Sequence, residues 1–335
     1  MSLAKKSLSI FIRDGFLFIS NAVISIILAR SLGPQYLGLW FALNLIPSYA
    51  ELFGRIKIDV AAVYFLSKGK YSLNEILPVI NTLAIIFSAA IVGIYLMFAP
   101  SINLFLFKEF ANEMKYFAIL ILIQIPLTFL YMNYLYVHIY LDDRKVVNRM
   151  ALMRSLVSFI IIVVSFVLTS FNLSIISVML ATLTGILSAL FYGIYKAPLH
   201  SFFRFIYQKL MIRDLFKYGI QLYITGIFSY LNVYVVQFLV LSYLMPVQMS
   251  YYTVAQQNSQ LFQKLSDAVS VFLFPSITKN ENSEERIELT LRVFRVLLTM
   301  LIPCLILAFI FLKPLVQLTY GVKYQFEQIN DIFRE

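Results

Sequence analysis

The stretch YLGLWFALNLIPSYAELFGRIKIDVAAVYFL, residues 36–66, decides how the whole sequence is interpreted. It is longer than the roughly 20 apolar residues that an α-helix needs to cross a hydrocarbon core of about 30 Å. It nevertheless contains Glu51, Arg55, Lys57 and Asp59, in a chain in which only 13% of the residues are charged. Because a charge at the bilayer centre costs at least about 2.5–3.5 kcal/mol, we expect these side chains to face protein or water rather than lipid.

Apolar runs of similar length recur along the 335 residues, 61% of which are hydrophobic, and the mean hydropathy is +0.83. This composition predicts an all-α polytopic membrane protein with about nine complete transmembrane helices and the start of a tenth near residue 328. The N-terminal apolar run is too long for a cleavable signal peptide and no small-residue cleavage site follows it. The predicted spans are 10–30, 36–66, 76–99, 116–140, 147–170, 173–195, 216–242, 247–274 and 288–312.

The net charge of +10 comes from Lys and Arg residues that are distributed unevenly between the loops on the two sides of the membrane. About 18 of the 27 Lys and Arg residues lie at the N-terminus or in the loops after the second, fourth, sixth and eighth spans. Those on the other side are Arg30, Lys108, Lys115, Lys313 and Lys323. Because cytoplasmic loops collect Lys and Arg, this bias predicts a cytoplasmic N-terminus in the cell (plasma or inner) membrane, and not a nucleic-acid partner.

Two proline-marked turns indicate an internal repeat. RSLGPQYLGLWFAL (30–43) aligns with LSYLMPVQMSYYTVA (241–255), and FAPSINLFLF (98–107) aligns with LKPLVQLTYG (312–321). The repeat is then about 213 residues and six spans, and both copies begin on the inner side, as in parallel repeats. This predicts an N-terminal lobe (1–195), a basic amphipathic cytoplasmic linker (196–215) and a C-terminal lobe (216–335). Because two full copies need about 426 residues, we expect the second lobe to be incomplete and the chain to be a fragment or a truncated product.

Polar residues form stripes on four of the predicted helices. In the second span, Glu51, Arg55 and Asp59 follow Asn44 and Ser48 at helical spacing, so a continuous helix puts all five on one face. The three charges alternate in sign and can pair along the helix, whereas Lys57 points elsewhere, toward the inner surface. The repeat offset places four polar residues of the eighth span at matching positions: Gln256, Gln260, Gln263 and Asp267. The stripe on the seventh span comprises Gln221, Thr225, Ser229 and Asn232. The stripe on the first span comprises Asp14, Asn21 and Ser25. We expect four such faces to enclose a hydrated cavity; the alternative is self-neutralised contact between helices.

Four segments resemble the polysaccharide-biosynthesis flippases of the multidrug/oligosaccharidyl-lipid/polysaccharide exporter superfamily. They are ILARSLGPQYLGLWFALN (27–44), YFLSKGKYS (64–72), LFPSITK (273–279) and KPLVQLTYGVKY (313–324). The resemblance implies two six-helix lobes, a central cavity lined by helices 1, 2, 7 and 8, and alternating access. It also implies transport of a polyprenyl-phosphate or -diphosphate oligosaccharide from the inner to the outer leaflet. The Arg-Asp pair that lipid II flippases of the superfamily carry before the end of helix 1 is replaced here by Ile24 and Ser25, which disfavours lipid II.

Such a substrate suggests a role for each polar position. Arg55 is the first choice for the phosphate, because a guanidinium fork can bind two oxygens. The candidates for sugar hydroxyls are Asn44, Ser48, Gln221, Asn232, Gln256, Gln260 and Gln263. The carboxylates Asp14, Glu51, Asp59 and Asp267 are candidates to bind Na⁺ or H⁺ and couple transport to an ion gradient, or to compensate the cations. Tyr223, Tyr230 and Tyr234 share one face of the seventh span, where they can stack on sugar rings or simply pack.

Rival functions stay open at this point. A multidrug or organic-cation antiporter of the same superfamily would favour a net acidic cavity with an aromatic cage. No residues support a membrane glycosyltransferase or ligase. The paired carboxylates Asp142-Asp143 lie in a basic loop, and His138 and His200 lack partners at the spacing of metal ligands. Cys304 is the single cysteine, which excludes an internal disulfide and a cysteine-based metal site. We therefore expect no enzyme, no cofactor and no metal; a non-transporting scaffold is a third class, and glycan-assembly enzymes are candidate partners.

Overall fold

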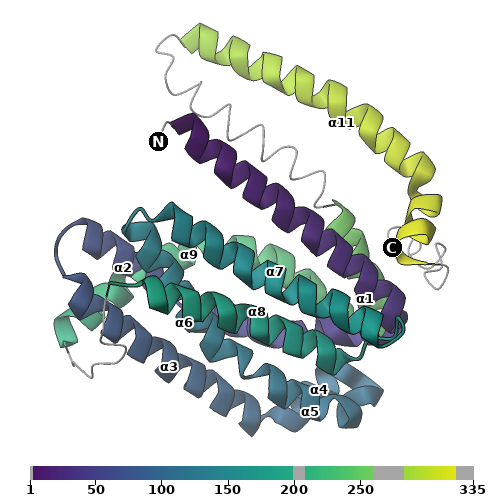
Figure 1. The fold of residues 1–335 in the computed structure, drawn as a ribbon, viewed down its shortest axis with the longest axis horizontal. Coiled ribbons are helices and arrows are strands. Elements are labelled where there is room, and N and C mark those ends of the chain that lie inside the picture. Colours follow the sequence, from purple (N-terminus) through teal and green to yellow (C-terminus); the bar gives the residue numbers. More distant parts are fainter. Residues whose placement is uncertain (1–2, 199–207, 260–282, 322–335) are drawn as a thin grey trace. The chain divides into compact units, whose positions relative to one another are not determined.

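The computed structural model describes residues 3–198, 208–259 and 283–321, and all its regular elements there are helices. The chain divides into two compact units, Met1–Met249 and Ser250–Glu335. The polytopic all-α fold predicted from composition is therefore confirmed (Figure 1).

The longest element of the first unit, α1 (Leu3–Gly54), consists of two helices that meet at Gly33. Gly33 has φ 71° and ψ 172°, a conformation that is essentially confined to glycine. Pro34 follows directly, at a position where its fixed φ suits the start of a helix. Gly33 and Pro34 thus separate the first predicted span from the second.

The helices that follow are joined by short connections. They are α2 (Ile58–Ser67), α3 (Leu73–Met97), α4 (Ala99–Phe107), the 3₁₀ turn η1 (Lys108–Phe110), α5 (Ala111–Ile121), α6 (Gln124–Tyr140), α7 (Arg144–Leu168) and α8 (Ile175–Lys196). Helix α8 packs against α7 and α6, while α6 also packs against α3 and α2 (Figure 1). The predicted fourth span is divided, because α5 ends at Ile121 and α6 begins at Gln124.

Helix α9 (Lys209–Tyr243) packs against α2. It begins inside the interval predicted as a linker, so part of 196–215 is helical; the division into two lobes stays a prediction. In the second unit, α11 (Ser283–Tyr320) is preceded by the helical residues 250–259, and Asn258 Nδ2 donates to the Tyr320 hydroxyl at 3.3 Å.

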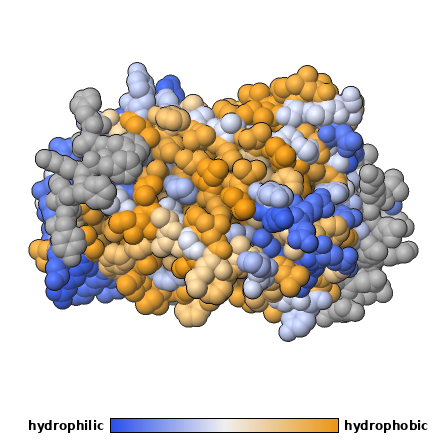
Figure 2. All heavy atoms as spheres, turned by 90° about the horizontal axis from the view of Figure 1, so that it is seen from below, coloured by the Kyte–Doolittle hydropathy of each residue, from blue (hydrophilic) through white to orange (hydrophobic). Residues whose placement is uncertain are grey.

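Among the described residues, six segments are long and apolar enough to cross a membrane. They are Gly15–Gly54, Leu73–Met97, Ala99–Tyr140, Arg144–Leu168, Ile175–Lys196 and Thr290–Leu307. The predicted number is larger because it divides Gly15–Gly54 at Pro34 and includes 216–242 and 247–274, the latter lying partly outside the described residues. Many large apolar side chains are exposed, and Figure 2 shows that hydrophobic residues cover much of the surface on one side of the molecule. Apolar exposure on this scale suits contact with lipid.

The prediction of one continuous helix over 36–66 is wrong. Helix α1 ends at Gly54, residues 55–57 are not helical, and α2 begins at Ile58. The break therefore lies inside the predicted span, at its charged residues.

Candidate functional site

The interruption of the second span is built from residues that rarely adopt its backbone conformation. Ile56 has φ 44° and Lys57 has φ 52°, so two successive non-glycine residues lie in the left-handed region. Such a conformation costs about 1–3 kcal/mol per residue and persists where the surrounding structure imposes it, as at ligand-binding sites. Within a membrane span, non-helical backbone is tolerated where protein buries it or where it lines a water-filled cavity.

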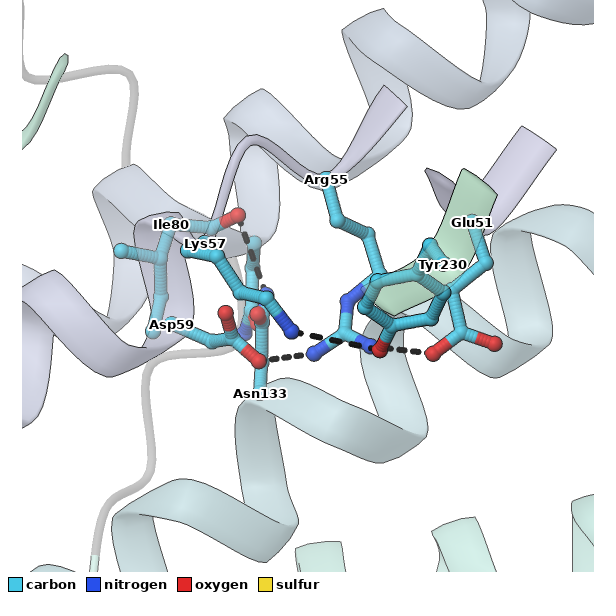
Figure 3. A network of polar contacts seen from close by, with 8 residues as sticks. Glu51, Arg55, Lys57, Asp59, Ile80, Asn133 and Tyr230 are labelled. Carbon is cyan, nitrogen blue, oxygen red and sulfur yellow. Dashed lines mark hydrogen bonds and ion pairs between the residues drawn. The ribbon is translucent and has the colours of Figure 1, made fainter. Parts of the chain in front are cut away.

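Arg55 bridges this break by ion pairs to both sides. Its Nη1 donates to Glu51 Oε1 on α1, and its Nη2 donates to Asp59 Oδ2 in the first turn of α2 (Figure 3). The Arg55 side chain is 11% exposed, that of Asp59 2% and that of Glu51 29%. The predicted pairing of these three charges is therefore confirmed, although it joins two helices rather than running along one.

Lys57 does not point away from this cluster, and that prediction is wrong. The left-handed backbone turns its side chain toward α9, where Nζ donates to the Tyr230 hydroxyl at 3.3 Å (Figure 3). The ammonium lies 5.0 Å from the centroid of the Tyr230 ring, within cation–π range. Among the described residues no carboxylate pairs with Lys57, in contrast to Arg55.

A small pocket lies between the break and α9. Its polar lining comes from Glu51, Arg55 and Lys57 on one side and from Tyr223 and Tyr230 on the other, with Gly226 between the tyrosines. Gly226 leaves space, since a Cβ there would lie 4.0 Å from Lys57 Cε. The tyrosine face continues along α9, because Tyr230 and Tyr234 stack with centroids 6.2 Å apart. The pocket thus combines two cations, one half-exposed carboxylate and an aromatic wall.

A buried amide network supports the other side of the break. Asn133 on α6 donates from Nδ2 to the Ile80 carbonyl at 3.0 Å (Figure 3). The same nitrogen donates to Asn81 Oδ1 at 3.2 Å. Asn81 in turn donates to the Tyr134 hydroxyl at 3.3 Å. Asn133 and Asp59 line a second small pocket. Sequence reasoning missed these amides, because each is a lone Asn in an apolar helix; a polar residue buried in a span is the signal that could have identified them.

A second contact between the span and α9 lies beyond the end of α2. Lys70 Nζ pairs with Asp214 Oδ2 at 2.5 Å, and the Tyr71 hydroxyl donates to the same oxygen at 2.7 Å. Nearby, the rings of Tyr64 on α2 and Tyr218 on α9 stack with centroids 4.1 Å apart. We call the group Lys70, Tyr71 and Asp214 the loop latch.

The loop latch is expected to persist across the physiological pH range. The hydrogen bonds from Lys70 and then Tyr71 lower the pKa of Asp214, and the hydrogen bond to Asp214 raises the pKa of Lys70. A lowered carboxyl pKa means that the contact is lost only as pH falls through that lowered value, and a raised ammonium pKa means that it is lost only well above neutrality. The distance between spin labels on the 68–72 loop and the start of α9 should therefore stay constant between about pH 5 and pH 9.

Asp214→Asn should increase that distance throughout the same pH range, because the neutral amide no longer pairs with Lys70. Lys209→Gln, a change at the same helix end but outside the latch, is the matched control. A distance in the wild type that changes near neutral pH would contradict the assignment of the latch to Lys70 and Asp214.

The other residues predicted for the site are distributed as follows. Asn44 Nδ2 donates to the Trp40 carbonyl at 2.7 Å and Ser48 Oγ to the Asn44 carbonyl at 2.8 Å, so both bond to their own helix. Gln221 is exposed on α9. Gln256 belongs to the second unit. The side chains of Asp14, Ser229 and Asn232, and the residues Gln260, Gln263 and Asp267, lie outside what the structure describes.

Besides the buried amides, the break itself and the position of Lys57 in it were missed. A signal for the break is present: Gly54 ends a helix, a polar run follows, and Asp59 falls in the first turn of the next helix. Nothing local indicates that Lys57 contacts Tyr230, which lies 173 residues further along the chain.

Comparison with known proteins agrees with this architecture. A family model described as polysaccharide biosynthesis protein matches residues 27–327. The solved structure titled lipid II flippase MurJ, inward closed conformation, is similar with a TM-score of 0.74 and 20% sequence identity. The match covers 95% of this chain and 68% of that chain, and at this identity it shows a shared fold. No curated protein matches the sequence.

Proposed function

Because this chain belongs to the polysaccharide biosynthesis protein family, we propose that it moves a polyprenyl-phosphate- or -diphosphate-linked oligosaccharide from the inner to the outer leaflet by alternating access. The observation that carries the proposal is the charged, tyrosine-walled pocket at the break of a membrane helix. The fold shared with a protein titled a lipid II flippase supports a lipid-linked substrate.

The pocket suits the two polar parts of such a substrate. Phosphate oxygens require cations held away from bulk water, and Arg55 and Lys57 are half-buried within a span. Sugar rings present hydroxyls and apolar faces, which suit the hydroxyls and rings of Tyr223 and Tyr230. The lipid chain needs no polar site, because it can remain in the bilayer.

Glu51 supplies a route for coupling transport to a proton. Arg55 uses one arm for Glu51 and the other for Asp59, and Glu51 is the more exposed of the two carboxylates. A proton taken up by Glu51 would remove one ion pair and leave that arm of Arg55 for a substrate phosphate. In this proposal Arg55 contacts phosphate only after Glu51 releases it, while Asp59 stays as permanent charge compensation. Asp14 and Asp267 remain candidates for an Na⁺ or H⁺ site.

The membrane context belongs to the same proposal. The Lys and Arg bias supports a cytoplasmic N-terminus in the cell membrane, with the loop latch on the cytoplasmic side. The sequence repeat supports two lobes, 1–195 and 216–335, with sugar-binding positions Gln256, Gln260 and Gln263 on the second. Enzymes of glycan assembly are the proposed partners, because they supply and consume the lipid-linked substrate.

The experiment that tests the function is a flipping assay. Purified chain would be reconstituted in liposomes that carry a fluorescent polyprenyl-diphosphate oligosaccharide, and label in the outer leaflet would be measured over time. We expect equilibration that depends on the protein. If the chain moves an organic cation and not this lipid, the proposal is wrong and the antiporter class is correct.

A further inference from the structure

We infer that Lys57, rather than Arg55, is the group on which the substrate phosphate first binds, in a subsite whose opposite wall is formed by Tyr223 and Tyr230. The inference rests on the proposed function, because it assigns a residue of that site to the anionic part of the substrate. It reverses the order of importance that the sequence suggested, in which Arg55 was the phosphate contact and Lys57 lay outside the site.

The positive charge of Arg55 is already compensated by its neighbours. Both terminal nitrogens of Arg55 donate to carboxylates, and these two carboxylates outweigh its single charge. An incoming phosphate would therefore meet two negative neighbours at Arg55 and would have to displace one of them. The net positive end of the pocket is Lys57, whose partners among the described residues are the hydroxyl and ring of Tyr230.

The position of Lys57 in the pocket is energetically costly. A lysine inside a membrane span without a carboxylate partner is unfavourable, and such residues usually mark a substrate or ion pathway. Lys57 also has a left-handed backbone, which adds strain. A lysine at this position in a regular helix would face a different direction. The structure therefore places the ammonium in the pocket at an energetic cost, and binding of an anion there would offset that cost.

The shape of the pocket at α9 suits a phosphate that carries a further group. Tyr223 and Tyr230 flank Gly226 on α9, and the end of the Lys57 side chain lies over Gly226. A larger side chain at 226 would fill the space beside the ammonium. A phosphate ester bound to Lys57 would place the group that it carries against the tyrosine rings, which suits a sugar better than a bare anion.

The test measures binding and transport separately. Two probes would be titrated onto the chain in nanodiscs: a fluorescent polyprenyl-diphosphate oligosaccharide and inorganic pyrophosphate. Lys57→Gln should weaken binding of the lipid-linked probe by about 10-fold or more, since one charge-assisted hydrogen bond is removed. Lys57→Arg should remain within a few-fold of the wild type. Gly226→Leu should weaken binding like Lys57→Gln, because it fills the pocket without changing its charge.

Lys68→Gln is the matched control, because Lys68 also lies over a tyrosine ring, that of Tyr64, but outside the pocket. Weaker binding of either probe to Lys57→Gln supports the inference and shows whether the lipid-linked ester or the bare anion is bound. Unchanged binding of both probes overturns it. Failure of the wild type to flip a lipid that it binds through Lys57 would overturn the proposed function and leave the phosphate subsite standing.

Discussion

Replacing Arg55 with alanine is expected to abolish transport and to lower the stability of the folded chain by about 3–5 kcal/mol, the usual cost of removing one partner from a buried ion pair. The reason is Asp59, which is 3% exposed and has Oδ2 paired with Arg55. Its other oxygen, Oδ1, is buried and receives no hydrogen bond from the described residues. Without Arg55 the Asp59 carboxylate would be a buried charge with no counter-ion among the described residues.

The measurements are thermal unfolding in detergent and the flipping assay, made on the same preparation. A neutral variant separates the two effects: Glu51→Gln, Arg55→Gln and Asp59→Asn together remove all three charges, and the two carboxylate replacements keep the shape of their side chains. We expect this triple variant to unfold near the wild-type temperature, because none of the three positions then carries an unpaired charge, and not to transport. Normal flipping by the triple variant would show that Arg55 has no role beyond structure.

Glu51→Gln alone distinguishes coupling from charge compensation. If Glu51 couples transport to protons, the variant should express normally, flip its substrate and lose the dependence on a pH gradient. If Glu51 only compensates Arg55, the variant should lose stability and keep any gradient dependence. The half-exposed position of Glu51 favours the first outcome, since loss of a partly solvated ion pair costs less than loss of a buried one.

These residues also show how far sequence reasoning reaches. The alternation of Glu51, Arg55 and Asp59 at intervals of four predicted their pairing correctly, because a chain that leaves a helix for only three residues still brings such neighbours together. The helix break could not be predicted with the same certainty. Ile and Lys seldom adopt positive φ, and the helix that packs beside them, α9, is distant in sequence.

The position of Lys57 follows from the break, and so it was missed for the same reason. On a continuous helix each residue is rotated by about 100° from the one before it. Lys57 comes two residues after Arg55, so a continuous helix would turn it away from the charged face, and the expectation that it points elsewhere follows from that geometry. The left-handed turn reverses that geometry. Lys57 then contacts Tyr230, which belongs to α9. No local sequence pattern indicates that α9 packs against α2.

Gly219 and Gly226 on α9 offer a direct test of what imposes the break. Both are interior helical glycines, so replacement by alanine should favour the helix at each by about 0.8–1.0 kcal/mol. Their neighbours differ. A Cβ at Gly219 would lie 2.6 Å from the Ile56 carbonyl oxygen, whereas a Cβ at Gly226 would lie 4.0 Å from the flexible end of Lys57.

Gly226→Ala should therefore be neutral or slightly stabilising, and Gly219→Ala should be destabilising by about 1–3 kcal/mol, the usual cost of overpacking. The cost arises because the atom in the way is backbone and cannot rotate aside. Either α9 moves away from the break or Ile56 changes conformation, and both would weaken the contact between Lys57 and Tyr230. Thermal unfolding and probe binding of the two variants, measured side by side, should differ in that direction. Equal stability and equal binding would mean that the close approach of α9 does not hold the break, and that the left-handed turn is imposed from within α1 and α2, by the ion pairs of Arg55.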